Sequence, residues 1–245
     1  MILQARLDWN YKKMSTLRQD PQTRLLECQT SWERGIYRIS FPNQKIRKLD
    51  ENSPDSKTMV YQICNPDNEI KSMGAYIPIT VSPRRHYDDQ LSCDIISNKG
   101  KYGAYTARLA TGMFFFMKFL YPKFLQSDYI VPIPAQNSNT VTGPISIVNH
   151  LVEYVKNDST YKILPLSPLE KRFNQKMKSM HRQARREFYE KNPDAFVVKN
   201  NVDLKGKIIL LVDDVLTSGS TMRFCKNKLE KAGAIVNSIT AAVTA

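Results

Sequence analysis

Two acids and four hydroxyl side chains follow the most apolar short segment of the chain. Residues 208–212 are uniformly apolar, as in a parallel strand that is buried on both faces. Asp213 and Asp214 come directly after them, and a helix is expected from about residue 220 to residue 232. Between the acids and this helix, Gly219 lies among four hydroxyls, those of Thr217, Ser218, Ser220 and Thr221. Ligands of open α/β sheets bind at such strand ends, so the sequence predicts a binding site here.

This turn has the chemistry of a phosphate site. Backbone N–H groups at a helix N-terminus attract anions, and hydroxyl groups add further donors. Gly219 lets the backbone come close to a ligand. Asp213 and Asp214 are poor phosphate ligands, but they suit ribose hydroxyls, a hydrated metal or a developing positive charge. A phosphorylated sugar fits both halves of the segment, whereas a helix cap with incidental acids is the alternative interpretation.

The same segment resembles a family motif. Residues 209–221 consist of four apolar residues, two acids, two apolar residues and then Thr-Ser-Gly-x-Thr. This pattern resembles the phosphoribosyl-pyrophosphate (PRPP) motif of the type I phosphoribosyltransferases. The order of the expected elements from residue 96 onward is similar to the ComF-like branch, although the chain lacks the cysteine cluster that usually binds zinc there. The loop over residues 135–140 also has no cation, where the family usually has an arginine.

The resemblance implies an enzyme that transfers ribose 5-phosphate from PRPP to a nitrogen nucleophile and releases pyrophosphate. Mg²⁺ would be carried on the substrate, without direct protein ligands. The acceptor base is left open, because this family has no shared acceptor signature. The implied site residues are Asp213 and Asp214 for the ribose, Thr217, Ser218, Gly219, Ser220 and Thr221 for the 5-phosphate, and Pro134, Ala135 and Gln136 for the pyrophosphate.

A basic segment precedes this motif. Residues 171–186 contain seven Lys or Arg residues and no acid, and apolar residues at helical spacing predict an amphipathic basic helix. Three interpretations stay open. The segment is a flap that closes over the pyrophosphate of PRPP, a contact surface for nucleic-acid phosphates, or a solvated helix face. The candidate flap residues are Lys178, Arg182, Arg185 and Arg186.

Strands and helices are expected to alternate in the second part of the chain, which predicts a parallel α/β sheet with flanking helices. Residues 96–245 would form this phosphoribosyltransferase-like domain. Residues 1–95 have a less regular pattern and would form an α+β hood or accessory region. The expected helices cover residues 104–125, 144–156 and 220–232, and the expected strands cover residues 129–134, 161–164, 195–198, 207–212 and 234–244.

The charge of the chain leaves a second function open. The 245 residues include 36 Lys and Arg against 23 Asp and Glu, a net charge of +13. This excess suggests a polyanionic partner, although it is also consistent with a basic protein whose charge serves solubility. The alternative to a transferase in nucleotide metabolism is therefore a non-catalytic module on the same fold. It would sense nucleotides or bind nucleic acid, in a role of the competence or DNA-processing type.

The sequence also predicts a compartment. The longest nearly uncharged apolar run, residues 109–117, is too short to span a bilayer, and charged residues interrupt the N-terminal segment where a signal peptide would be apolar. The four cysteines form no CxxC pair, which argues for reduced thiols rather than a zinc ribbon. A cytoplasmic protein without membrane contacts is expected, either monomeric or a homodimer.

Overall fold

The structure is a computed structural model. It describes residues 70–76, 78–80, 87, 90–98, 103–134, 143–173, 180 and 182–244, together with the backbone of four N-terminal strands. These four strands form an antiparallel sheet in chain order, and they are β1 (Ile2–Leu7), β2 (Lys13–Gln19), β3 (Leu26–Thr30) and β4 (Ile36–Ile39).

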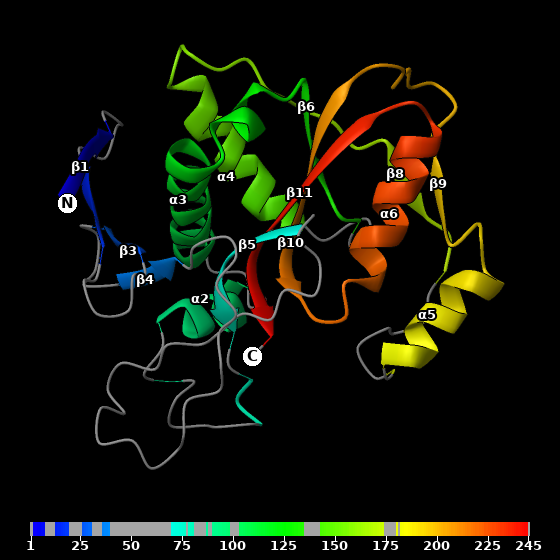
Figure 1. The fold of residues 1–245 in the computed structure, drawn as a ribbon, viewed down its shortest axis with the longest axis horizontal. Coiled ribbons are helices and arrows are strands. Elements are labelled where there is room, and N and C mark those ends of the chain that lie inside the picture. The colour runs from blue at the N-terminus through cyan, green and yellow to red at the C-terminus, as the bar shows by residue number, and fades with distance from the viewer. Residues whose placement is uncertain are drawn as a thin grey trace.

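A five-stranded parallel sheet forms the centre of the molecule (Figure 1). All four of its strand pairs are parallel, which confirms the predicted α/β class. One edge strand comes from residues 70–76, so the sheet draws on both sides of the predicted boundary at residue 96; that division stays a prediction. In spatial order the strands are β5 (Ile70–Tyr76), β11 (Ile235–Thr244), β10 (Ile208–Leu216), β6 (Tyr129–Pro132) and β7 (Leu164–Pro165).

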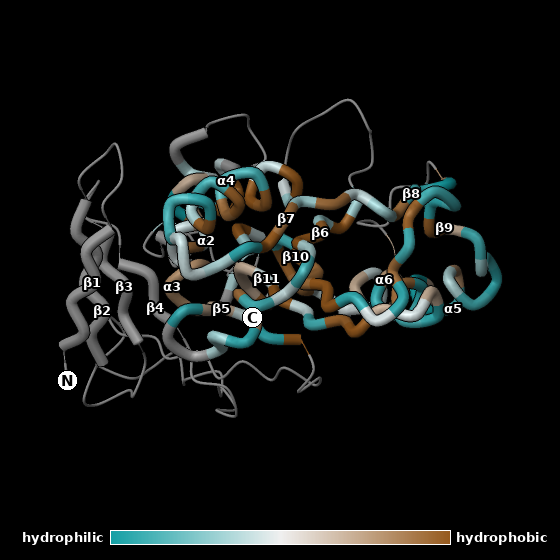
Figure 2. Tube along the Cα trace, turned by 90° about the horizontal axis from the view of Figure 1, so that it is seen from above, coloured by the Kyte–Doolittle hydropathy of each residue, from teal (hydrophilic) through white to brown (hydrophobic). Residues whose placement is uncertain are grey.

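Helices cover both faces of this sheet (Figures 1 and 2). One face packs against α2 (Gln90–Asn98), α3 (Gly103–Leu120) and α4 (Pro144–Lys156). The other face packs against α6 (Ser220–Lys231), and α5 (Arg182–Lys191) lies outside α6. The short antiparallel pair β8 (Leu169–Lys171) and β9 (Phe196–Val198) lies beside α6.

The two faces have separate hydrophobic cores. The α3–α4 face contains Phe114, Phe115 and Phe116, each at most 1% exposed, so the apolar helix predicted there is confirmed as a core helix. It ends at Leu120 rather than at residue 125, and the 3₁₀ turn η1 (Pro122–Gln126) follows. No helix in the described part of the chain is long and apolar enough to cross a membrane.

Two of the predicted strands have a different position or a different partner in the structure. The strand expected over residues 161–164 is shifted to the two residues of β7, because only the backbone after Ile163 reaches β6; Leu164 N donates to Asp128 O at 3.0 Å. The strand expected near residues 195–198 exists as β9, but it pairs with β8 outside the main sheet.

The basic segment is not one helix. Lys171 belongs to β8, and Arg172 N donates to Ala195 O at 2.9 Å, which extends the pairing with the β9 side. Phe173, predicted to lie on a helical stripe, packs instead on Phe196 with ring centroids 5.4 Å apart. The helix α5 begins only at Arg182, while residues 174–179 and 181 lie outside the described residues.

Candidate phosphate site at the turn between β10 and α6

The two acids lie within a strand, not in the turn that follows it. β10 continues through Asp213 and Asp214 to Leu216, where the sequence predicted an end at Val212. It does so because its partner β11 extends to Thr244, so that Asp213 pairs with Thr240 and Val215 with Ala242. The acids therefore have a fixed backbone direction rather than the freedom of a loop.

Asp213 and Asp214 lie on opposite faces of β10. Side chains alternate along a strand, and Leu211 belongs to the α6 core whereas Val212 belongs to the α3–α4 core. Asp213 is accordingly on the α6 face, where its charge adds to the effect of burial in raising the pKa of the Cys225 thiol on α6. On the other face, a Cβ at Gly143 would be 3.6 Å from Asp214 Oδ2, which places this carboxylate beside the N-terminus of α4.

Each acid has a further polar neighbour. Burial raises the pKa of the Tyr76 phenol at the end of β5, and the charge of Asp214 raises it further. Thr240 is level with Asp213 on the adjacent strand, and its fully buried hydroxyl has no hydrogen-bond partner among the described residues. Thr240 was not predicted as a site residue, because its position beside Asp213 depends on strand register.

The turn itself is short. Thr217, Ser218 and Gly219 connect β10 to α6, and Gly219 has a left-handed φ of +72°, which favours glycine. The hydroxyl oxygens of Ser218 and Ser220 are 3.1 Å apart, and Ser218 Oγ also accepts a 3.4 Å hydrogen bond from Ser220 N. The hydroxyls of Ser218 and Ser220 thus lie together at the first residue of α6.

α5 contacts the residues on both sides of Gly219, Thr217 in the turn and Thr221 in α6. Arg185 Nη1 donates to Thr217 Oγ1 at 2.7 Å, and Arg185 Nε donates to Met180 O at 3.0 Å. Four residues further along α5, the Tyr189 hydroxyl is 2.9 Å from Thr221 Oγ1. Burial raises the pKa of Tyr189 to about 12, so this hydroxyl keeps its proton at neutral pH and can donate to Thr221.

A second arginine lies against the turn. Arg223 Nη1 approaches Ser218 O at 3.4 Å, and a Cβ at Gly219 would be 3.4 Å from both Cζ and Nη2 of Arg223. Arg223 was not predicted as a site residue. It could have been predicted, because it lies in the first turn of the helix expected from residue 220, and side chains there lean back toward the helix N-terminus.

Other predicted residues are less closely grouped. Pro134 follows β6 beside the acids, since Ile133 N donates to Val212 O at 2.9 Å. Arg186 lies away from the turn, 80% exposed and paired with Glu190 at 3.0 Å. Ala135, Gln136 and Lys178 lie outside the described residues, and of Arg182 only its place at the start of α5 is described.

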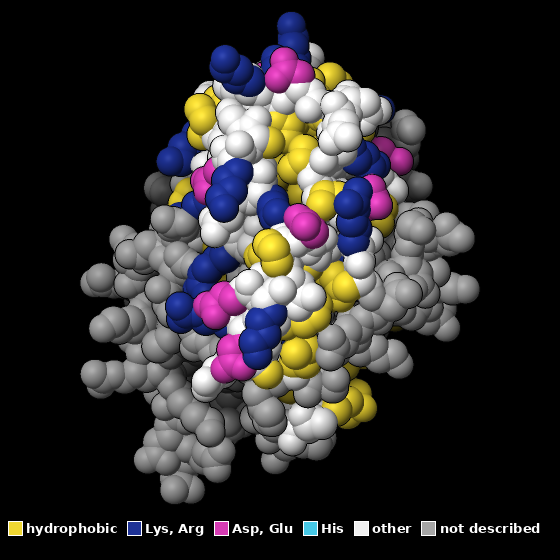
Figure 3. Space-filling model, turned by 90° about the vertical axis from the view of Figure 1, so that its right-hand side faces the viewer, with side chains coloured by type: hydrophobic (Ala, Val, Ile, Leu, Met, Phe, Trp, Pro, Cys, Tyr) yellow, Lys and Arg dark blue, Asp and Glu magenta, His cyan; other side chains and the backbone are white. Residues whose placement is uncertain are grey.

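The outer face of α5 and α6 carries both signs of charge (Figure 3). Basic and acidic side chains alternate over it, so the described residues of this face form no uniform basic patch. The ion pairs of α5, α6 and the neighbouring β8 and β9 segments include Arg172–Glu170, Arg186–Glu190, Lys226–Glu230 and Lys228–Asp194.

The described residues contain no group of three or more His, Cys, Asp or Glu side chains that could hold a metal ion. The carboxylates of Asp213 and Asp214 point to opposite faces of β10. No family model and no curated protein matches the chain.

Proposed function

We propose that this protein binds PRPP and transfers its ribose 5-phosphate to a nitrogen nucleophile, with pyrophosphate leaving. One observation carries the proposal. A glycine turn rich in hydroxyls connects a buried parallel strand, which ends in two acids, to the N-terminus of a helix. By resemblance, the sheet and its helices form a type I phosphoribosyltransferase fold of the ComF-like branch, and the part of residues 1–95 outside β5 and α2 would form its hood.

The turn supplies the phosphate end of this site. The backbone N–H groups at the start of α6 and the hydroxyls of Thr217, Ser218 and Ser220 are the donors. Thr221 contributes through its place in the first turn of α6, because its hydroxyl contacts Tyr189. Gly219 keeps the approach to the backbone open.

The strand end supplies the sugar end. Asp213 and Asp214 flank the end of β10 from its two faces, so they would accept hydrogen bonds from different hydroxyls of one ribose. The buried Thr240 hydroxyl beside Asp213 is a further polar group on this side. During transfer the C1–O bond to pyrophosphate breaks, the new C1–N bond forms and the acceptor loses its proton. The two carboxylates would stabilise the positive charge that develops on the ribose.

Magnesium fits this arrangement as an ion that the substrate carries. Carboxylate oxygens are hard ligands that Mg²⁺ accepts, and the ion usually keeps several waters and binds phosphates. Asp213 or Asp214 alone could hold such an ion, directly or through water. When bound, the metal would neutralise charge on the departing pyrophosphate.

Calorimetric titration of PRPP into the full-length chain, with and without Mg²⁺, tests the proposal. We expect Mg²⁺-dependent binding that is lost in the double variant Asp213→Asn/Asp214→Asn. Asp194→Asn removes an acid that is 81% exposed and lies outside the site, and it should bind PRPP as the natural chain does. Unchanged affinity in the double variant would overturn the site.

A negative result would be equally informative. If PRPP does not bind but nucleic acid does, with an affinity that falls steadily as salt rises, the non-catalytic module is the better description. If PRPP binds, product formation with a panel of nitrogenous bases would identify the acceptor.

A further inference from the structure

Two guanidinium groups approach the glycine turn from two different helices. Arg185 reaches it from α5 and donates to the Thr217 hydroxyl at 2.7 Å. Arg223 reaches it from α6 and lies within 3.4 Å of the Ser218 carbonyl oxygen. Both arginines are half-buried.

Charge explains why a phosphate would need these groups. Asp213 and Asp214 precede the turn by only a few residues, and two negative charges near it would oppose the binding of an anion. A phosphate monoester carries close to two negative charges at neutral pH. Guanidinium groups are always charged and hold two phosphate oxygens at once, so a pair of them offsets the repulsion.

The contacts also favour one of the two phosphate groups of PRPP as the one that these arginines would bind. Arg185 was predicted as a flap residue for pyrophosphate. By the family resemblance, pyrophosphate would lie near the segment after β6. The contact of Arg185 is instead with Thr217, at the 5-phosphate end. α5 is held there by the stack of Tyr189 on Phe224, with ring centroids 4.6 Å apart, and by the contact of Tyr189 with Thr221.

We infer that Arg185 and Arg223 form an arginine clamp on the 5-phosphate, which makes the turn selective for a doubly charged phosphate monoester. That the phosphate belongs to a ribose rests on the proposed function. The clamp itself is inferred from the phosphate group alone. The pyrophosphate of PRPP is then left to Mg²⁺ and to other residues.

Separate titrations with ribose 5-phosphate and with pyrophosphate test the clamp in the full-length chain. Arg185→Ala and Arg223→Ala should each weaken ribose 5-phosphate binding by about 10- to 100-fold, the effect of losing a hydrogen bond to a charged group. Both variants should leave pyrophosphate binding unchanged. Arg172→Ala is the matched control, because it removes an exposed arginine, paired with Glu170, from the same side of the molecule.

Two further readouts separate the clamp from a merely structural role. Arg185→Lys and Arg223→Lys keep the charge but lose the planar fork, and they should bind ribose 5-phosphate with intermediate affinity. In the natural chain this affinity should fall as pH drops through about 6, where the phosphate gains a proton, and the alanine variants should lose much of that dependence. Thermal unfolding of each variant checks that it is folded.

The outcomes distinguish the clamp from the transferase. If ribose 5-phosphate binding depends on both arginines but PRPP does not bind, the clamp stands and the proposed function fails. If PRPP binds and depends on the acids, while the arginine variants bind ribose 5-phosphate normally, the clamp fails and the function stands. A selective loss of pyrophosphate binding in Arg185→Ala would overturn the clamp in favour of the flap.

Discussion

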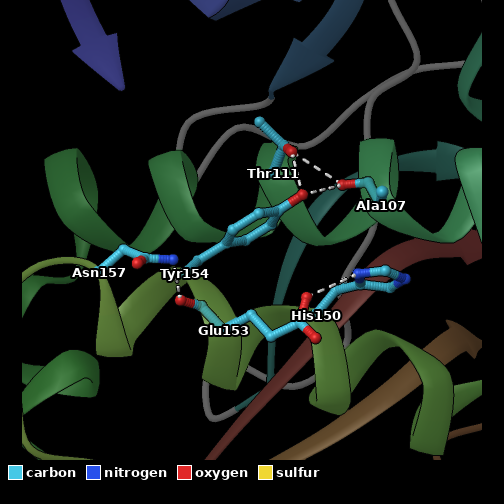
Figure 4. Close-up of polar contacts among 6 residues, drawn as sticks. All are labelled: Ala107, Thr111, His150, Glu153, Tyr154 and Asn157. Carbon is cyan, nitrogen blue, oxygen red and sulfur yellow. Dashed lines mark hydrogen bonds and ion pairs between the residues drawn. The ribbon is translucent and has the colours of Figure 1, made fainter. Parts of the chain in front are cut away.

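The two faces of the parallel sheet are built differently. The face under α3 and α4 is closed by large apolar side chains, and its helices are joined where the Tyr154 hydroxyl donates to Ala107 O at 2.9 Å and also contacts Thr111 (Figure 4). On the other face, α5 and α6 join through aromatic rings, and their polar contacts converge on the turn after β10. We conclude that the first face mainly supplies stability, with Asp214 at its edge, and that the second positions the proposed phosphate end of the site.

The largest effect is expected in the α3–α4 core. Phe114 is fully buried among Phe115, Tyr154 and Tyr161, so Phe114→Ala should lower the free energy of unfolding by about 3–5 kcal/mol. Urea unfolding measures this loss. Ribose 5-phosphate affinity should be unchanged wherever the variant is still folded. A large loss of affinity would show that the two faces are coupled.

A pair of glycines tests the site face. Gly219 and Gly206 have nearly the same φ, +72° and +71°, so alanine should cost about 1 kcal/mol of stability at either position. A Cβ at Gly206 would meet nothing within 4 Å, whereas one at Gly219 would lie 3.4 Å from the Arg223 guanidinium and 3.4 Å from Leu216 Cδ1. Only Gly219→Ala should therefore weaken ribose 5-phosphate binding, by about tenfold as measured by calorimetry. Equal affinities in the two variants would contradict the contact between Arg223 and the ligand.

Two tyrosines extend the comparison across the sheet. Tyr189 contacts Thr221 on the site face, and Tyr189→Phe should cost about 1 kcal/mol and weaken ribose 5-phosphate binding, because α5 loses a bond to the turn. On the other face, the buried Tyr121 hydroxyl has no partner among the described residues, so Tyr121→Phe should be neutral or stabilising. Thermal unfolding and calorimetry of the two variants measure both effects. A destabilised Tyr121→Phe variant would mean that this hydroxyl has a partner after all.

These contrasts show which features the sequence could predict. The bounds of α4 were predicted exactly, because Pro144 favours the first helical turn and the apolar residues follow a helical period. The turn at Gly219 was located because its glycine and hydroxyls stand next to an unbroken apolar strand. In both places local sequence alone determines the structure.

Features that depend on pairing were missed. β5 has no clear pattern, with Lys71, Ser72 and Gly74 in its seven residues, and it is a strand because β11 pairs with it. The same strand register extends β10 through the acids and places Thr240 beside Asp213. In the sequence, Phe173 fits a helical spacing. In the structure, the pairing of β8 with β9 places it against Phe196 instead. Such contacts join distant segments, and local periodicity does not encode them.

The smallest effect concerns an ion pair on the stability face. Lys118 Nζ of α3 lies 2.8 Å from Asp158 Oδ2, just after α4, and Thr160 N donates to Asp158 Oδ1 at 3.2 Å. Partial burial opposes ionisation of Asp158, but the hydrogen bonds from Lys118 and Thr160 outweigh it, and the pKa lies below its usual 3.8. The folded chain therefore holds this proton less tightly than the unfolded chain does.

The stabilisation by Asp158 should accordingly be complete above about pH 4 and disappear as pH falls through the lowered pKa. Because both side chains are partly exposed, Asp158→Asn should cost no more than about 1 kcal/mol at pH 7, and less in about 1 M NaCl, where screening is strong. Urea unfolding of the natural chain and the variant at pH 7 and near pH 3 measures the difference, which should shrink at the lower pH. A difference that is independent of pH would assign the effect to packing, and any change in ribose 5-phosphate affinity would show that the pair of Lys118 and Asp158 is coupled to the site.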